Sequence, residues 1–598
     1  MTIGAILIAN RGEIAVRIVR ACRLMGVRAI AVHSVADRGA LWTRIADDAC
    51  EIGPAPARDS YLSIERLIAA AKAAGADAVH PGYGLLSESA EFAAAVRDAG
   101  LIFIGPSAEA IARMGDKVAA RAAATAAGVP VLPGSDRPVA DAGEALAIAE
   151  AIGWPIAVKA SFGGGGRGMR VARKKKELNA ALEQAAREAS AAFGRGDIYL
   201  ERYLDRPRHV EVQILADAHG NIIHLGDRDC SVQRRHQKLI EEAPAPALPA
   251  KLRQRILDAA VTLAKRERYE SAGTVEFLAD AANDAFYFLE MNTRLQVEHG
   301  VSELVTGVDI VCEQIRIAAG EKLRLSQKDV RVHGCAIQAR IAAEDPWENF
   351  RPTPGTLEAL HLPLGPWLRL DFGVEAGDAI PGFYDSMFGK VQAWGATREE
   401  ARMRLAMALG TLEVRGPQTT APYLRHVLEQ ESFAAAAHDT GSLERDWTPD
   451  RFTRPPSTQA PSAASSDKPA ASARVVTLPW GGGATDVAVY GVSAARAAPN
   501  ALAGASRSQA AAGGARGPDL TAPMDSAVAM VAAKAGAKIA KGAPVVVLEA
   551  MKMEIVIAAP HDGVVEAIHV KAGDAVKSGA PLARVRTHKG EKKHDRSA

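Results

Sequence analysis

Two glutamates in residues 274–298 have the spacing of a paired carboxylate site. The segment consists of two apolar, strand-like stretches around a turn at residues 283–284. In such an antiparallel hairpin Glu276 and Glu290 lie opposite each other, and Asn292 shares their side. Opposed carboxylates repel, whereas a divalent cation such as Mg²⁺ is held by carboxylate and amide oxygens and bridges phosphates. The segment therefore predicts a metal site, since two exposed surface glutamates would fit poorly among these apolar neighbours.

Three polar residues that follow this hairpin suit the binding of a small anion. Arg294, Gln296 and Glu298 alternate along the chain, which favours one shared face. A cation, an amide and a carboxylate that converge would hold an anion beside a general base. Arg340, at the end of the stretch 335–340, offers a second cation, although a lone arginine at a strand end is usually a surface residue.

A glycine-rich run at residues 161–169 predicts a loop that covers phosphates. It contains four consecutive glycines, including Gly165 and Gly166, and lies between two strand-like stretches. Glycine lets backbone N–H groups crowd around an oxyanion without side-chain clash, and Lys159 precedes the run. A flexible linker is the alternative, but the apolar flanks oppose it. The run is not a P-loop, because no G-K-[ST] leads into a helix.

A third chemical feature is Lys552, which lies between two methionines near the end of the chain. Residues 521–550 align without gaps onto residues 558–587, an offset of 37, so one short β-rich unit occurs twice. The lysine lies between the copies, at a predicted hairpin tip. An exposed lysine is normally a solvated surface residue, but apolar flanks on a protruding turn indicate a surface that another protein binds. The run Glu549-Ala550-Met551-Lys552-Met553 resembles the attachment signature of biotin carrier domains; lipoyl domains are the alternative.

The elements that must position these residues begin with an α/β unit. Apolar strands at residues 4–9, 28–32, 76–79 and 101–104 and a helix at 13–25 predict a mostly parallel sheet. Loops at the carboxyl ends of such strands usually bind ligands. No G-x-G-x-x-G follows the first strand, so a dinucleotide fold is not favoured.

Composition sets the limits of these interpretations. The 598 residues correspond to about four domains, and the net charge of +2 argues against a protein built to hold nucleic acid or a membrane. The basic run at 228–238 lacks the aromatic residues of a nucleic-acid site. Five cysteines without C-x-x-C pairs, no signal sequence and no apolar run of membrane-spanning length predict a reduced, cytoplasmic protein.

The stretch from about residue 450 to 520 predicts a tether between the catalytic body and the carrier unit. It is rich in Pro, Ala, Ser and Gly, a composition that buries too little apolar surface to fold. About 65 flexible residues would reach roughly 40–50 Å. A small β hairpin at 474–490 is the exception that the pattern predicts.

Taken together, these segments resemble biotin carboxylase, an ATP-grasp enzyme, fused to a biotin carrier. The resemblance covers about residues 1–445 and 520–587 and is carried by five motifs. The motifs are Ile8-Ala9-Asn10-Arg11-Gly12-Glu13-Ile14-Ala15, His80-Pro81-Gly82-Tyr83-Gly84, Met114-Gly115-Asp116-Lys117, the glycine run and Glu290-Met291-Asn292-Thr293-Arg294.

The resemblance implies an α/β multidomain fold with a defined order of domains. They are a pre-ATP-grasp α/β domain at 1–113, an ATP-grasp domain at 114–325 with a lid at 131–204, and a biotin carboxylase C-terminal α+β domain at 326–445. A linker at 446–520, an all-β barrel-sandwich hybrid biotinyl domain at 521–587 and a basic tail at 588–598 complete the chain.

It also implies site roles. ATP contacts would be Lys117, Lys159, Gly165, Gly166, Glu201, Leu204, His209, Gln233 and His236. Glu276, Glu290 and Asn292 would hold Mg²⁺ or Mn²⁺. Lys238, Arg294, Gln296 and Val297 would hold bicarbonate. Glu298 would be the general base, Arg340 would stabilise the biotin enolate, Tyr83 would line the biotin pocket, and Lys552 would carry biotin.

The implied function is that of an acyl-CoA carboxylase alpha subunit. Glu298 would deprotonate bicarbonate for attack on ATP, and biotin on Lys552 would carry the carboxyl group to a separate carboxyltransferase beta subunit. Lys552 would be modified by a biotin protein ligase, and homo- and hetero-oligomers are expected. Alternatives are another biotin-dependent carboxylase, such as one for pyruvate, and a carrier or scaffold with a decayed catalytic body.

Three departures from the family pattern stand out. Gly300-Val301-Ser302 replaces the usual Pro-Val-Thr, which would loosen the loop after Glu298, and Met524-Asp525-Ser526 replaces the usual Met-Pro-Gly turn. The linker is shorter than in animal-type propionyl- and methylcrotonyl-CoA carboxylases, which have a larger docking domain there.

Overall fold

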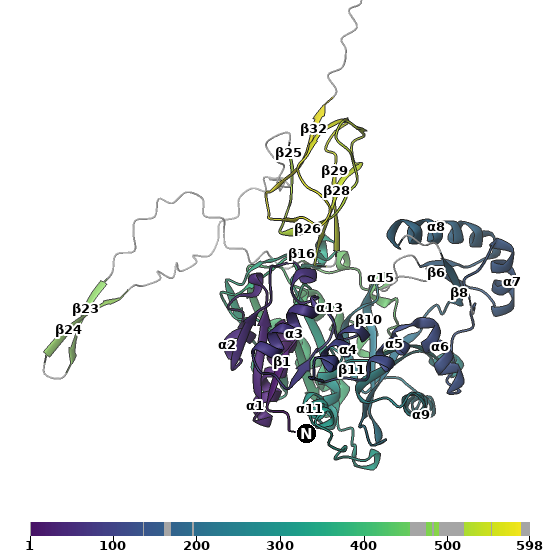
Figure 1. Ribbon diagram of the computed structural model, residues 1–598, viewed down its shortest axis with the longest axis horizontal. Helices are drawn as coiled ribbons and strands as arrows, with labels where there is room; N and C mark the ends of the chain where they lie inside the picture. The colour runs from purple at the N-terminus through teal and green to yellow at the C-terminus, as the bar shows by residue number, and fades with distance from the viewer. Residues whose placement is uncertain are drawn as a thin grey trace, which may run out of the picture.

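The computed structural model describes residues 2–135, 137–160, 169–193, 197–454, 474–480, 483–489, 519–551 and 553–587. It shows a large catalytic body, an outlying lid and a separate β domain (Figure 1). Gly165, Gly166 and Lys552 lie outside the described residues, as does most of the predicted linker. Within that linker, β23 (Arg474–Trp480) and β24 (Gly483–Val489) form an antiparallel pair.

The N-terminal domain is a five-stranded parallel sheet in the order β3-β2-β1-β4-β5. The strands are β1 (Ala5–Ile8), β2 (Arg28–His33), β3 (Asp48–Glu51), β4 (Ala78–His80) and β5 (Ile102–Phe103). The helices are α1 (Gly12–Met25), α2 (Leu41–Ile45), α3 (Ile64–Ala73), α4 (Ala90–Asp98) and α5 (Ala108–Gly115). Strand order through the sheet reverses between β1 and β4, and such a switch point opens a ligand crevice. Asn10 closes it by donating from Nδ2 to the Tyr83 carbonyl at 2.8 Å.

One antiparallel sheet of eight strands forms the centre of the body, in the order β13-β12-β9-β10-β11-β14-β21-β19. Its strands are β9 (Arg208–Ala216), β10 (Ile222–Arg234), β11 (Gln237–Ala243), β12 (Ser271–Asp280), β13 (Ala285–Asn292), β14 (Cys335–Ala342), β19 (Leu368–Phe372) and β21 (Met387–Gly395). The sheet runs without a break from the predicted ATP-grasp domain into the predicted C-terminal domain, because β11 pairs with β14.

Apolar faces of helices cover this sheet. Helix α9 (Ala250–Arg266) buries Leu252, Ile256 and Leu263 at helical spacing, in one cluster with Val210 of β9. Helices α12 (Arg398–Thr411) and α13 (Ala421–Leu428) pack over the C-terminal part. Helices α6 (Lys117–Ala126), α10 (His299–Thr306) and α11 (Ile310–Ala318) complete the body near the site.

The lid is a small layer that projects from the body (Figure 1). It contains a three-stranded sheet, β7-β6-β8, with β6 (Ile156–Ala160), β7 (Arg170–Ala172) and β8 (Ile198–Arg202). Helices α7 (Ala142–Ile152) and α8 (Lys175–Phe193) pack on it. Strands β6 and β7 pair antiparallel on either side of the glycine run, as the flanking pattern predicts.

The C-terminal β domain confirms the internal repeat. Its two four-stranded sheets have the orders β25-β32-β30-β27 and β29-β28-β26-β31. The first copy contains β25 (Asp519–Thr521), β26 (Ser526–Val531), β27 (Lys538–Ile539) and β28 (Pro544–Ala550); the second contains β29 (Met553–Ala558), β30 (Gly563–Ile568), β31 (Ala575–Val576) and β32 (Pro581–Thr587). Each copy gives strands to both sheets, so the β domain is a pseudo-symmetric sandwich.

Gly300 does not loosen the chain after Glu298, contrary to the sequence-based expectation. It lies buried in the first turn of α10, against Gln392 of β21. A Cβ at this position would be 1.9 Å from Gln392 Oε1. Gln392 is itself buried and donates from Nε2 to Asp371 at 2.9 Å, so it has little freedom to move away. Glycine here makes room for that glutamine.

We predict that Gly300→Ala destabilises the body by about 1–3 kcal/mol, because overpacking a buried site forces neighbours from their rotamers. Gln392→Ala in the same chain removes the overlap and recovers part of the loss. Thermal melts of the wild type, both single variants and the double variant measure this coupling. Additive effects of the two substitutions would contradict the assignment.

Candidate active site

Four charged side chains form a row across neighbouring strands of the central sheet. Glu290 of β13 pairs with Glu276 of β12, Glu276 with Glu211 of β9, and Glu211 with Arg228 of β10. Paired residues point to the same face of a sheet, so three carboxylates and one guanidinium line up. The pairing of Glu276 with Glu290 is the one that the sequence predicts.

Lys238 of β11 is the cation that this row shares. Its Nζ lies 2.5 Å from Glu211 Oε2, 2.8 Å from Glu276 Oε1 and 2.7 Å from Glu298 Oε1. Burial alone would lower the pKa of Lys238, but the acidic groups around it outweigh burial and raise that pKa well above its ordinary value. Lys238 therefore stays charged and offsets the repulsion between the carboxylates.

Glu298 is a fully buried carboxylate held by two cations. Besides Lys238, Arg340 of β14 contacts it, with Nη2 2.9 Å from Glu298 Oε2. Burial would raise the pKa of Glu298, but Lys238, Arg340 and then Arg228 together hold it well below its ordinary value. Arg340 is fixed in turn by Glu241, at 2.5 Å from Nε. It is therefore a buried, oriented cation and not a surface residue.

The predicted metal ligands lie together, with one member open to the cleft. Asn292 Nδ2 donates to Glu276 Oε1 at 2.8 Å, while Glu290 is exposed. Withdrawal from bulk water and repulsion by Glu276 raise the pKa of Glu290. A carboxyl that is hard to ionise beside a second carboxylate suits an added divalent cation, so these oxygen donors fit Mg²⁺.

Arg294 and Gln296 converge as the sequence predicts, although they lie in a loop and not on a strand. Arg294 donates from Nη1 to Gln296 Oε1 and from Nη2 to Asn292 Oδ1, both at 3.0 Å. Glu88 of the N-terminal domain accepts from Arg294 Nε at 2.8 Å. Val297 follows, and its carbonyl accepts from Lys390 Nζ at 2.6 Å. The anion-binding loop is thus tied to three domains.

Tyr83 meets this group from the N-terminal domain. Its hydroxyl hydrogen bonds to Glu13, which also lies 3.1 Å from Lys390 Nζ. Burial, followed by the Glu13 charge, raises the pKa of Tyr83 well above its ordinary value, so it stays a neutral phenol. Next to it, His80 Nδ1 accepts from the Gly82 N–H at 3.0 Å and shapes the turn that carries Tyr83.

The expected nucleotide contacts surround the mouth of the lid. Lys159 of β6 pairs with Glu201 of β8, whose pKa is lowered because Lys159, Arg121 and Lys117 together outweigh burial. His209 Nε2 lies 2.9 Å from Glu276 Oε2, next to the carboxylate row. Gln233, His236 and Leu204 lie in β10, the turn after it and the segment after β8.

Sequence reasoning missed several residues that complete the site. They are Glu13, Glu88, Glu211, Arg228, Glu241 and Lys390. A signal existed for Glu211, because His209, Glu211 and Gln213 alternate in an otherwise apolar strand. Arg228 was assigned to a basic run, but it is fully buried and contacts Glu211 at 2.6 Å. The others come from distant segments and give no local signal.

Comparison with known proteins agrees with this architecture. Three family models match in succession: "Biotin carboxylase, N-terminal domain" at residues 2–111, "Carbamoyl-phosphate synthase L chain, ATP binding domain" at 116–326 and "Biotin carboxylase C-terminal domain" at 338–445. A fourth, "Biotin-requiring enzyme", matches 516–585.

Individual relatives are similarly close. The chain is 48% identical to biotin carboxylase 1 of Bacillus subtilis, over 73% of this chain and 98% of that protein. It is 50% identical to a pyruvate carboxylase subunit of Methanothermobacter thermautotrophicus, over 72% and 87%. A crystal structure of the biotin carboxylase domain dimer of 2-oxoglutarate carboxylase from Hydrogenobacter thermophilus, with MgADP, ADP and bicarbonate, superposes with a TM-score of 0.70 at 45% identity, over 74% and 98%.

The fold and these matches define the class: the chain belongs to the biotin carboxylase family. More particularly, it joins a complete set of biotin carboxylase domains to a biotinyl domain in one polypeptide. In the part of the chain that the structure describes, no helix combines the length and apolarity needed to cross a membrane, and all five cysteines are free thiols.

We predict a pH-dependent stability that depends on His80. Burial, followed by the Arg17 charge, lowers the pKa of His80 to about 3. Below its unfolded pKa of about 6.5 the unfolded chain binds a proton that the folded chain does not, which removes about 2 kcal/mol of stability by pH 5.

The measurement is the melting temperature of wild type and His80→Asn at pH 7 and pH 5. Asparagine keeps an acceptor for Gly82 but does not titrate, so the variant should lose less stability on acidification. Equal losses in both proteins would show that His80 is protonated in the folded state.

Proposed function

We propose that this chain carboxylates biotin on Lys552, using ATP and bicarbonate, as the alpha subunit of an acyl-CoA carboxylase. A separate carboxyltransferase subunit would receive the carboxyl group. The main support is the convergence of Lys238, Glu298 and Arg340 on one sheet face, in a chain that also contains a biotinyl domain. The acyl-CoA assignment rests on the order of this fusion.

In this proposal bicarbonate binds among Lys238, Arg294, Gln296 and the backbone of Val297. An anion that enters here draws Lys238 away from Glu298 and adds negative charge beside it, and both effects raise the pKa of Glu298 toward that of a useful base. Glu298 then takes the bicarbonate proton, and a bicarbonate oxygen attacks the γ-phosphorus of ATP as ADP leaves.

The carboxyphosphate that results breaks down to CO₂ and phosphate. The phosphate takes a proton from the ureido nitrogen of biotin, which then attacks CO₂. Arg340 stabilises the negative charge that develops on the ureido oxygen, because Glu241 holds its guanidinium in place. Tyr83, neutral and hydrogen bonded to Glu13, lines the biotin pocket.

The nucleotide is bound by residues of the body and the lid. They are Lys117, Lys159, Gly165, Gly166, Glu201, Leu204, His209, Gln233 and His236. Glu276, Glu290 and Asn292 would hold Mg²⁺, which when bound neutralises charge on the phosphates. The role of the protein in this step is to position ATP and bicarbonate and to exclude water.

A keto-acid carboxylase is the second candidate. It is favoured by similarity to one chain of a pyruvate carboxylase and to a 2-oxoglutarate carboxylase domain. The two candidates share every residue described above and differ only in the protein that accepts the carboxyl group.

We predict that purified, biotinylated protein with ATP, Mg²⁺ and labelled bicarbonate acquires label on the biotin of Lys552. Glu298→Gln should retain the fold and lose about 10²–10⁴-fold in rate, because amide nitrogen and oxygen cannot take the proton. ATP hydrolysis that does not respond to bicarbonate, with no label, would contradict the proposal. Unchanged carboxylation by Glu298→Gln would remove its assigned role.

We further predict that the protein co-purifies with a carboxyltransferase of crotonase-like fold, which would accept an acyl-CoA. Affinity purification from the native cell, followed by mass spectrometry, checks this. A metal-dependent TIM barrel as the co-purified partner would instead favour the keto-acid candidate.

A further inference from the structure

The biotinyl domain contacts the catalytic body through a short turn at residues 381–383. The Met551 N–H donates to the Gly382 carbonyl at 3.2 Å. The backbone at Asp525 approaches so closely that a Cβ on Gly382 would lie 2.4 Å from the Asp525 carbonyl oxygen. A second contact joins Gly573 to the N-terminal domain, where Arg58 Nη1 lies 3.3 Å from a Cβ built on that glycine.

Met551 anchors this contact with its side chain. It is 5% exposed, and it belongs to the apolar cluster of the C-terminal domain that contains Ile380 and Phe388. Its φ of 50° is a left-handed conformation that is unfavourable for a side chain with a Cβ. The apolar residue before the modified lysine therefore has a partner within its own chain.

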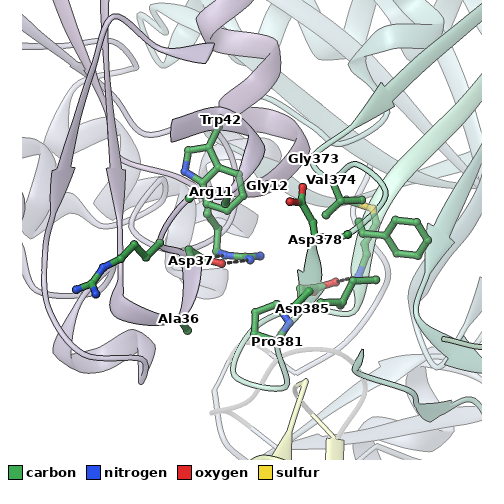
Figure 2. A pocket seen from close by; sticks show the side chains of 18 residues that line it. Arg11, Gly12, Ala36, Asp37, Trp42, Gly373, Val374, Asp378, Pro381 and Asp385 are labelled. Atoms are coloured by element: carbon green, nitrogen blue, oxygen red, sulfur yellow. Dashed lines mark hydrogen bonds and ion pairs between the residues drawn. The ribbon is translucent and has the colours of Figure 1, made fainter. Parts of the chain in front are cut away.

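The turn is held rigidly where the N-terminal and C-terminal domains meet. Tyr384 donates from its hydroxyl to the Ala55 carbonyl at 2.6 Å, and the Arg11 guanidinium lies 4.2 Å from its ring centroid. Figure 2 shows Pro381 beside the pocket that these domains line, on the side where strands of the biotinyl domain (yellow) approach. A fixed turn costs little conformational entropy when it binds a partner.

The turn also leads directly to the proposed biotin pocket. Asp385, three residues after Gly382, lies close enough to Tyr83 for its charge to act on the phenol, and so does Arg340. Asp385 and Gly12 line the same pocket, and Glu13, next to Gly12, contacts Tyr83. A domain docked at Gly382 is therefore next to the residues assigned to biotin.

We propose that the turn at residues 381–383 is the docking platform that presents the chain's own biotinyl domain for carboxylation, with Met551 as the anchor and Gly382 as the point of closest approach. This inference rests on the proposed function. It assigns to Gly382 and Met551 a role in delivery of the substrate and not in the chemistry.

The test compares tethered with free biotin in the full-length, biotinylated protein. Gly382→Ala should slow single-turnover labelling of the chain's own biotin by about tenfold or more, because the added carbon overlaps the Asp525 backbone. Carboxylation of free biotin in solution should stay within about twofold of wild type, since the catalytic residues are untouched.

Gly355→Ala is the matched control. It introduces the same carbon into the same domain, where only Pro417 lies within van der Waals reach at 3.9 Å, and it should leave both rates unchanged. Met551→Ser, with biotin occupancy verified by intact mass, should reproduce the selective loss without altering the body.

Several outcomes would overturn the proposal. A wild-type rate of tethered carboxylation in Gly382→Ala would show that docking occurs elsewhere. Parallel loss of both activities in that variant would show that Gly382 acts on the catalytic site itself. By contrast, a wild-type protein that carboxylates neither free nor tethered biotin would contradict the proposed function, independently of the docking platform.

Discussion

The structure depends on one buried lysine that three carboxylates share. Lys238 contacts Glu211, Glu276 and Glu298, which come from β9, β12 and the loop after β13. Removing so many charges from water is costly, and a single uncompensated partner would destabilise the sheet. Arg228 and Arg340 complete the compensation from β10 and β14. The charges are thus satisfied only when these separate segments assemble in register.

The same arrangement explains how the site can be inactive without its substrates. A carboxylate that two cations hold is too weak a base to take a proton, and Glu298 is in that state here. Substrates that compete for Lys238 and Arg340 would release it. Base strength would then appear only when bicarbonate and biotin are in place, which limits wasteful hydrolysis of ATP.

Much of this site could be predicted from local pattern. The hairpin register follows from counting residues about the turn, so Glu276, Glu290 and Asn292 are predicted together. The duplicated carrier unit follows from self-similarity. Glu13, Glu88 and Lys390 could not be found, because what makes them functional is burial beside segments that are distant in sequence. Gly300 was misjudged for a related reason: a loop and a tightly packed helix start look alike until the opposing Gln392 is known.

The pairing of β11 with β14 has an evolutionary consequence. It joins the strands that carry Lys238 and Arg340 into one hydrogen-bonded plate across an apparent domain boundary. Two modules that share a sheet cannot be exchanged independently, since a foreign partner would have to reproduce both the register and the charge pattern. The biotinyl domain has no such seam with the body, and contacts it in the described residues through loops and turns. Recombination could therefore replace the carrier freely, whereas the catalytic body must be inherited whole.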